Sequence, residues 1–237
     1  MPHIQKRQKN SLNRTETFEE LPILFGKGGR DKLLVCLAVN GPLRVQTLAN
    51  AIGSHPSSVI EMIQHLEALG LVMTSRAPGY SYAAINQDLP IRQSLVAVLL
   101  ALDQRYPAPR RSSQAPQSGE WKSNPQPILT EIFSSVPRSR VLLFVAARGP
   151  SEMAEARREL RCGTAQIRQT VTHWERQGVV KSICAHGRRV IQLNERFHAA
   201  KPLLALLDEV LVLAHLSEKS LRSCRSFNAI TLASASA

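Results

Sequence analysis

The stretch Ile52–Val72, IGSHPSSVIEMIQHLEALGLV, carries the clearest signals of the fold. Gly53 interrupts one apolar segment, and the run Ser54–Ser58 then offers side chains that cap a helix and an early proline that suits a first turn. Gly70 suits the end of that helix, where the backbone commonly turns left-handed. Apolar residues return at helical spacing between these signals: Val59, Met62, Ile63 and Leu66. We therefore expect a helix over Pro56–Leu69 that begins after a tight turn.

Helix and strand signals flank this stretch on both sides. Upstream, Asp31–Val39 contains an apolar run that Asn40-Gly41-Pro42 ends, and Val45–Ile52 has the spacing of a short amphipathic helix. Downstream, Ala77-Pro78-Gly79 lies between two short extended segments, which predicts a hairpin. A last apolar helix follows over Ile91–Gln104. This order predicts a helix-turn-helix unit with a hairpin and a closing helix behind it.

The chain contains an internal repeat, because it matches itself without a gap when Arg30 is placed on Arg138. Residues 30–103 and 138–211 share 15 identical residues in this alignment. The matched glycines are the strongest part of this evidence, because shared glycine spacing indicates shared turns. We therefore expect a second unit of the same fold, with its equivalent of the Pro56–Leu69 helix over Thr164–Gln177.

The segments Ile52–Val72 and TSRAPGYSYAAIN (Thr74–Asn86) resemble the winged helix-turn-helix of ArsR-like and MarR-like transcriptional regulators. The second unit matches less well by itself and acquires the resemblance through the repeat. The resemblance implies a mainly α fold with small β hairpins (α+β), built as tandem winged helix-turn-helix domains. The metal-binding version of the ArsR-like family has a cysteine pair in the helix before the recognition helix, and this chain has none there.

Composition shifts along the chain predict five parts. The linker is rich in Pro, Ser and Gln, the N-terminal arm is basic with few apolar residues, and the C-terminal stretch ends in Leu-Ala-Ser-Ala-Ser-Ala. The expected parts are a basic N-terminal arm over 1–28, a first winged-helix domain over 29–105 (unit one), a linker over 106–126, a second winged-helix domain over 127–217 (unit two) and a C-terminal tail over 218–237.

Charge favours a polyanionic partner. Lys and Arg number 30 against 18 Asp and Glu, which gives a net charge of +12. Each phosphate that such a chain contacts releases counterions and favours binding, so we expect double-stranded DNA as the partner. The most apolar run, Pro202–His215, is too short to span a bilayer. The N-terminal sequence MPHIQKRQKN has no apolar signal core, so we expect a cytoplasmic, nucleoid-associated protein and no membrane partner.

Motifs for catalysis or metal binding are absent from the sequence. It has no P-loop, GxSxG or HExxH motif and no clustered carboxylates, so we expect no enzyme activity. The four cysteines form no CxxC pair, and Cys184-Ala185-His186 by itself does not make a metal site. We expect neither a metal nor a cofactor.

In this fold the second helix of the helix-turn-helix, called the recognition helix, enters the major groove. Here the recognition helices are expected over Pro56–Leu69 and Thr164–Gln177. The residues expected to contact DNA lie on these two helices and on the two hairpins, or wings. Arg suits guanine and Gln suits adenine, while short hydroxyls suit phosphates. The candidates are Ser54, Ser57, Ser58, His65, Arg76 and Tyr80 in unit one, and Thr164, Gln166, Arg168, Gln169, Thr172, His173, His186, Arg188 and Arg189 in unit two. Arg157, Arg158 and Arg161 precede the second recognition helix, so we expect unit two to supply more of the affinity. Glu61 departs from the family pattern in unit one, where it either reads a cytosine amino group or repels phosphate.

The closing helices are too apolar to face water on any broad side. Residues 91–104 and 202–215 therefore form either a homodimer interface or contacts within one chain, and both arrangements are open. We expect a sequence-specific DNA-binding transcriptional regulator of prokaryotic type. The alternatives are a plasmid-type replication or partition protein, which direct repeats in the DNA site would favour, and a winged-helix protein-interaction module without a DNA role.

Overall fold

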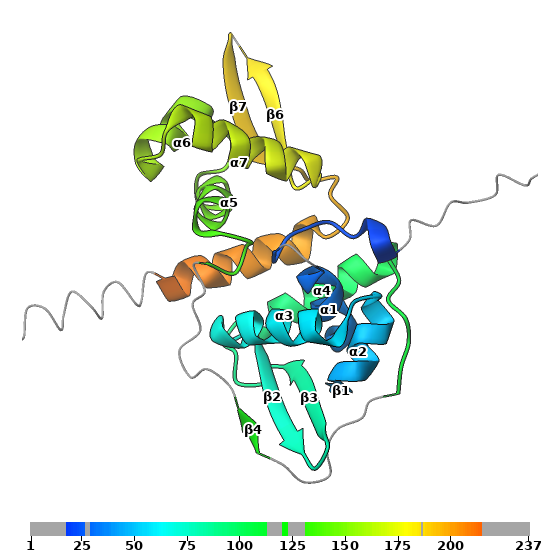
Figure 1. The fold of residues 1–237 in the computed structure, drawn as a ribbon. Helices are drawn as coiled ribbons and strands as arrows, with labels where there is room; N and C mark the ends of the chain where they lie inside the picture. The colour runs from blue at the N-terminus through cyan, green and yellow to red at the C-terminus, as the bar shows by residue number, and fades with distance from the viewer. Residues whose placement is uncertain (1–17, 27–28, 113–119, 123–130, 186, 215–237) are drawn as a thin grey trace, which may run out of the picture.

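The computed structural model describes residues 18–26, 29–112, 120–122, 131–185 and 187–214. These residues form two similar halves, whose hairpins point to opposite ends of the molecule (Figure 1). A helix over residues 200–214, orange in Figure 1, crosses between the halves. In that described part of the chain no helix has both the length and the apolar character needed to cross a membrane.

Unit one folds into the expected order of elements, with bounds within two residues of those predicted. They are α1 (Arg30–Asn40), β1 (Leu43–Arg44), α2 (Val45–Ile52), α3 (Pro56–Ala68), β2 (Val72–Ala77), β3 (Tyr80–Ile85) and α4 (Arg92–Arg105). The apolar face predicted for α3 is buried. The short strand β1 was not predicted, since two residues show no alternating pattern, and it pairs antiparallel with β3. The α+β winged-helix fold expected from the sequence is therefore confirmed.

Unit two repeats this order. Its elements are α5 (Val136–Arg148), β5 (Ser151–Glu152), α6 (Met153–Leu160), α7 (Thr164–Arg176), β6 (Val180–Ala185) and β7 (Arg188–Leu193). In the alignment that places Arg30 on Arg138, every element from β5 to β7 begins and ends at the same positions as its counterpart between β1 and β3. The strands form a sheet in the order β5-β7-β6, as β1, β3 and β2 do in unit one.

The repeat extends to individual side-chain hydrogen bonds. After each hairpin an asparagine Nδ2 donates to the carbonyl of the glycine that ends the recognition helix. The distance is 2.8 Å from Asn86 to Gly70 and 2.8 Å from Asn194 to Gly178. Both glycines have a positive φ, 76° and 72°, which only glycine adopts without strain. The two units are thus matched in detailed geometry, although few of their residues are identical.

The two halves share one hydrophobic core. Phe25 and Phe133, which occupy equivalent positions of the repeat and are fully buried, stack with ring centroids 5.8 Å apart and planes 25° apart. Such a contact between equivalent residues is what a two-fold axis produces in a symmetric dimer. Beside it, the Ile23 backbone N–H donates to Oε1 of Gln177 at 2.7 Å. The chain therefore contains an internal pseudo-two-fold interface.

The N-terminal arm differs from its prediction. Residues 21–26 were expected to belong to a basic arm, but Leu21, Leu24 and Phe25 are buried in the core, after a short 3-10 helix, η1 (Phe18–Glu20). Oδ1 of Asp31 accepts hydrogen bonds from the backbone N–H groups of Leu24 and Phe25, at 2.8 and 2.9 Å. The composition of residues 1–28, taken as a whole, is basic, and it therefore conceals the apolar cluster at 21–25.

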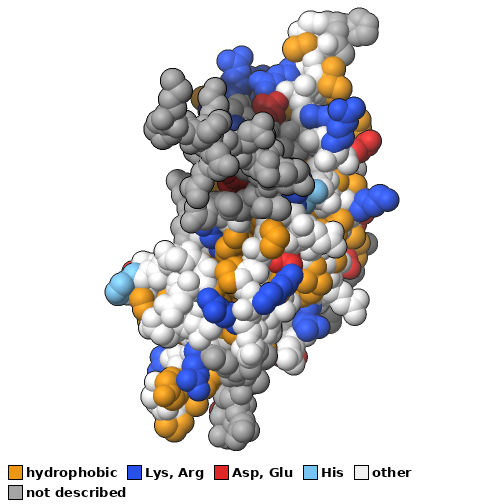
Figure 2. Space-filling model, turned by 90° about the vertical axis from the view of Figure 1, so that its right-hand side faces the viewer, with side chains coloured by type: hydrophobic (Ala, Val, Ile, Leu, Met, Phe, Trp, Pro, Cys, Tyr) orange, Lys and Arg blue, Asp and Glu red, His pale blue; other side chains and the backbone are white. Residues whose placement is uncertain are grey.

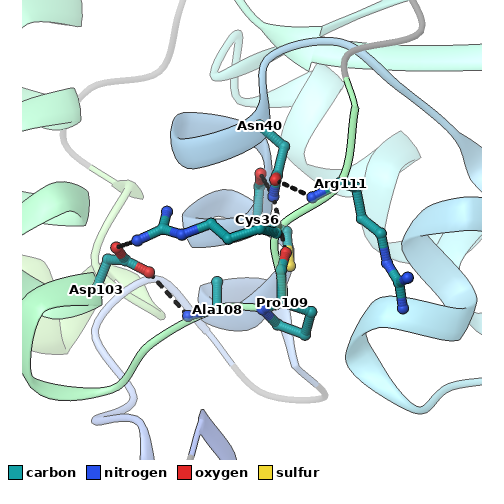
Figure 3. A network of polar contacts seen from close by, with 7 residues as sticks. Cys36, Asn40, Asp103, Ala108, Pro109 and Arg111 are labelled. Atoms are coloured by element: carbon teal, nitrogen blue, oxygen red, sulfur yellow. Dashed lines mark hydrogen bonds and ion pairs between the residues drawn. The ribbon is translucent and has the colours of Figure 1, made fainter.

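The start of the expected linker is also fixed to unit one. Nδ2 of Asn40 donates to the carbonyl oxygens of Cys36 and Pro109, at 2.9 and 3.1 Å (Figure 3). Oδ1 of Asn40 in turn accepts from the backbone N–H of Arg111 at 2.5 Å. One buried amide at the end of α1 thus holds the chain where it leaves α4.

Two further contacts hold this part of the linker in place. Asp103 on α4 accepts from the Ala108 backbone N–H at 2.8 Å and from Nη2 of Arg110 at 2.6 Å (Figure 3). Farther on, β4 (Trp121–Lys122) pairs antiparallel with β2 and adds a strand to the first wing. The segment predicted as a linker over 106–126 is thus held to unit one in these places, which its composition could not show, since composition does not report hydrogen bonds to distant elements.

Both closing helices bury their apolar faces inside the chain. The residues that enter the shared core are Leu95, Val98, Leu99 and Leu102 on α4 and Leu203, Leu206, Leu207 and Val210 on the helix over 200–214. Leu100, Leu204 and Val212 remain exposed. Of the two arrangements left open by the sequence, packing within one chain accounts for the buried faces.

The shared core makes a prediction about cooperativity. Phe133→Ala removes a fully buried ring from the contact between the halves and should lower the free energy of unfolding by about 3–5 kcal/mol. Urea denaturation followed by circular dichroism should show one transition in the wild type, at a lower midpoint in the variant. Two separate wild-type transitions, with only one displaced by the substitution, would contradict a single core.

A second prediction concerns pH. Burial raises the pKa of Asp31 to about 7, against the opposing effect of its hydrogen bonds from Phe25 and Leu24. Since the folded pKa lies above the unfolded value near 4, the contribution of Asp31 is present at low pH and lost as pH rises towards 7. Denaturation at a series of pH values should show wild-type stability falling relative to Asp31→Asn between pH 4 and 7. A constant difference across this range would contradict the assignment.

Candidate nucleic-acid interface

The first recognition helix, α3, presents its N-terminal hydroxyls to solvent. His55 caps the helix, its Nδ1 accepting from the Ser57 backbone N–H at 3.4 Å and lying 2.8 Å from the Ser57 hydroxyl. Ser57 and Ser58 are exposed, and Ser54 in the preceding turn is half-buried. Glu61 is exposed one turn further along. The predicted residues at this end of the helix therefore lie together on its accessible side.

His65 lies apart from that group, in the last turns of α3. Partial burial lowers its pKa, the nearby charge of Arg30 lowers it further, and Glu131 acts in the opposite direction. The pKa of His65 thus lies below its ordinary value, which disfavours the positively charged form of the ring. Because Glu131 belongs to unit two, His65 lies towards the junction of the two units.

The first wing is built around an arginine that the sequence analysis missed. The guanidinium of Arg44 lies over the ring of Tyr80, 4.1 Å from its centroid, and Nε of Arg44 donates to the Tyr82 hydroxyl at 3.2 Å. Tyr80 is 52% exposed, and Arg76 is exposed on the neighbouring strand. Arg44 could not be singled out from the sequence, because it is brought to the wing only by the pairing of β1 with β3.

The second recognition helix, α7, carries more polar groups on its outer side. Thr164, Gln166, Arg168 and Gln169 are all exposed. Thr172 and His173 are half-buried, and the His173 ring packs edge-on against Trp174 with centroids 5.0 Å apart. The four residues at the N-terminal half of α7 are therefore the accessible ones, and the other two lie closer to the core.

A groove of about 420 Å³ separates α6 and α7 from the second wing. Four arginines contribute to its lining: Arg157 from α6, Arg168 from α7, and Arg188 and Arg189 from β7. Met153 and Ile167 supply apolar surface to the lining, and Nη1 of Arg157 donates to Oγ1 of Thr164 at 3.2 Å. The groove thus combines a recognition helix, a wing and several cations, and it can accept an anionic backbone.

Arg189 braces the wing against α7. Its guanidinium donates to both carboxylate oxygens of Glu175, at 2.8 and 2.7 Å, and to the hydroxyl of Ser182 at 2.9 Å. Burial opposes ionisation of Glu175, but hydrogen bonds from Ser182 and Arg189 and the charge of Arg189 lower its pKa. The predicted contact residue Arg189 therefore uses much of its donor capacity inside the protein.

Arg188 is also paired, in a way that contrasts with unit one. Its Nη1 lies 2.7 Å from Oε1 of Glu152, although 70% of its side chain stays exposed. The equivalent positions in unit one hold Tyr80 and Arg44, which form the cation–π contact. The same two positions are thus joined by an ion pair in unit two and by a stacked arginine in unit one.

Further exposed cations lie on α6 and at its C-terminal end. Arg158 and Arg161 are exposed beside Arg157, and Arg168 makes no ion pair with any residue in the described ranges. Arg161 has φ 51°, a left-handed conformation that costs a non-glycine residue about 1–2 kcal/mol. Unit one has Gly53 at this position, with φ 66°. Unit two therefore places a charged side chain where the backbone favours glycine.

One predicted contact residue of the second wing, His186, lies outside the described residues. Within those that are described, no three His, Cys, Asp or Glu side chains gather into a group that could hold a metal ion. On the face seen in Figure 2, Lys and Arg side chains are spread along the length of the molecule, with fewer Asp and Glu side chains among them.

Comparison with known proteins agrees with the geometry of unit one. Residues 32–79, from α1 to the tip of the first wing, match the model of the MarR family. This match supports a winged-helix regulator that binds DNA. No curated protein matches the chain.

Proposed function

We propose that this chain is a sequence-specific double-stranded DNA-binding transcriptional regulator, built as two winged-helix domains in tandem. The groove between α7 and the second wing carries the proposal, because it places exposed cations beside a recognition helix. The MarR family match over residues 32–79 supports the same class of function from an independent direction.

Unit two supplies most of the phosphate contacts in this proposal. Arg157 and Arg168 line the groove, Arg158 and Arg161 are exposed near Arg157 in the chain, and the described ion pairs engage none of the four. The strained backbone of Arg161 supports a role for its charge, since strain of this kind collects at functional sites. Gln166 and Gln169 on the exposed side of α7 are suited to read adenine.

One chain acts as the equivalent of a dimer. Two recognition helices belong to one body with a continuous core and a pseudo-two-fold contact at Phe25 and Phe133. In helix-turn-helix dimers such symmetry places two recognition helices in successive major grooves, about 34 Å apart. We propose the same arrangement within one chain, with domains that follow the predicted limits but include residues 21–26 and the linker as far as Arg111.

The proposal predicts a salt-dependent, sequence-selective interaction that Arg168 carries. Duplexes enriched from random-sequence DNA should bind with an affinity that falls steeply as salt rises. Arg168→Ala should weaken binding about tenfold and reduce the slope of log K against log salt by about 1. Fluorescence anisotropy at several salt concentrations measures both quantities.

Lys201→Ala is the matched control, because Lys201 is an exposed cation on the helix over 200–214 and does not line the groove. Its affinity should stay within twofold of the wild type. If no duplex is enriched, or if binding does not depend on salt, the DNA role is wrong and a protein-interaction module takes its place. If Arg168→Ala and Lys201→Ala behave alike, DNA binding survives but the groove is not its site.

A further inference from the structure

Each unit carries a groove between its recognition helix and its wing, and the two grooves overlap in part but differ in chemistry. In unit one a groove of about 180 Å³ lies between α3 and the first wing. Its lining includes Val45, Ile60 and Ser81, whose counterparts in the repeat are Met153, Arg168 and Arg189 of the basic groove. Comparing these positions shows what each recognition surface can bind.

Every arginine of the basic groove is replaced by an uncharged residue in unit one. Arg157 and Arg168 correspond to Ala49 and Ile60. Arg188 and Arg189 correspond to Tyr80 and Ser81. The groove of unit one therefore lacks these four cations and has Arg76 and Glu67 as the charged residues of its lining, so it offers less positive charge to a phosphate backbone than the groove of unit two.

Ile60 is the most informative of these replacements. It lies in the N-terminal half of α3, the half that enters the major groove in helix-turn-helix proteins, and it is 44% exposed. A large aliphatic side chain exposed at such a place is available to contact an apolar feature of a partner. The 5-methyl group of thymine is the apolar feature of the major groove, and side chains of this kind recognise it by contact.

The surroundings of Ile60 favour DNA over a protein partner. Ser57 and Ser58 offer exposed hydroxyls one turn before it, which suit phosphate oxygens. Glu61 is exposed beside it and can accept a hydrogen bond from the amino group of cytosine. Arg44, stacked on Tyr80 at the wing, supplies a positioned cation at the edge of the same groove.

We infer that unit one reads bases mainly through Ile60, which contacts a thymine methyl, while unit two supplies most of the phosphate contacts through its arginines. The DNA site is then asymmetric, with a thymine in the half bound by unit one. A cytosine next to that thymine would pair with Glu61. This inference rests on the proposed DNA-binding function and assigns separate tasks to the two halves of the molecule.

The test removes a single methyl group from the DNA and a side chain from the protein. In a duplex selected from random-sequence DNA, each thymine is replaced in turn by deoxyuridine, which lacks only the 5-methyl group. An iron chelate on the exposed Cys184, in a chain with Cys162 and Cys224 changed to Ser, marks the half occupied by unit two through local strand cleavage.

In the half of the duplex bound by unit one, replacing one particular thymine by deoxyuridine should weaken wild-type binding about fourfold, since one buried methyl is removed. Ile60→Ala should lose a similar factor on the thymine duplex and show no further loss on the uracil duplex. Ile60→Val keeps a branched side chain and should behave like the wild type. Because Ile60 is exposed, none of these variants should change the circular dichroism spectrum.

The outcomes separate the inference from the function beneath it. If the wild type selects no duplex, the proposed function fails and the inference falls with it. If the wild type binds selectively, but each replacement of thymine by deoxyuridine lowers the affinities of the wild type and of Ile60→Ala by the same factor, only the inference is overturned. An Ile60→Ala variant with full affinity for the selected duplex would likewise exclude a DNA role for this residue and leave Ile60 to a protein partner.

Discussion

The structure depends on the burial of apolar surface between the two units, at the centre of which Phe25 and Phe133 stack. Asp31 and Ser139, at equivalent positions of the repeat, each accept a hydrogen bond from the backbone N–H of the phenylalanine in their own unit. The contact fixes the units as one body, so the spacing between α3 and α7 is set inside the chain rather than by association of two chains.

Within that frame, the two recognition surfaces have diverged. The carboxylate of Glu67 accepts from the Thr74 hydroxyl at 2.8 Å, and Glu175 accepts from Ser182 at the matching position. Unit two then adds Arg189 to this pair, where unit one has Ser81. A shared scaffold therefore keeps each helix and wing together while the outward residues differ. This divergence suits an asymmetric DNA site better than a strict palindrome.

Much of the fold could be predicted because local signals and the repeat agree. The Gly53 break, the Pro56 start and the Gly70 stop define α3 from its own residues, and the internal repeat extends the same prediction to α7. The structure corrects the prediction where distant contacts decide, at residues 21–26, at the Asn40 network and at β4. The site was only partly predictable for the same reason. An exposed arginine and one paired with Glu175 look alike in a sequence.

The central claim is that one chain presents two unequal recognition helices to one DNA site. The most direct measurement is the mass of the complex on a duplex that carries a single selected site, combined with its hydroxyl-radical footprint. One chain per duplex, protecting two patches about one helical turn apart, is the result that this account predicts. Two chains per duplex, or one chain that protects a single patch, would contradict it.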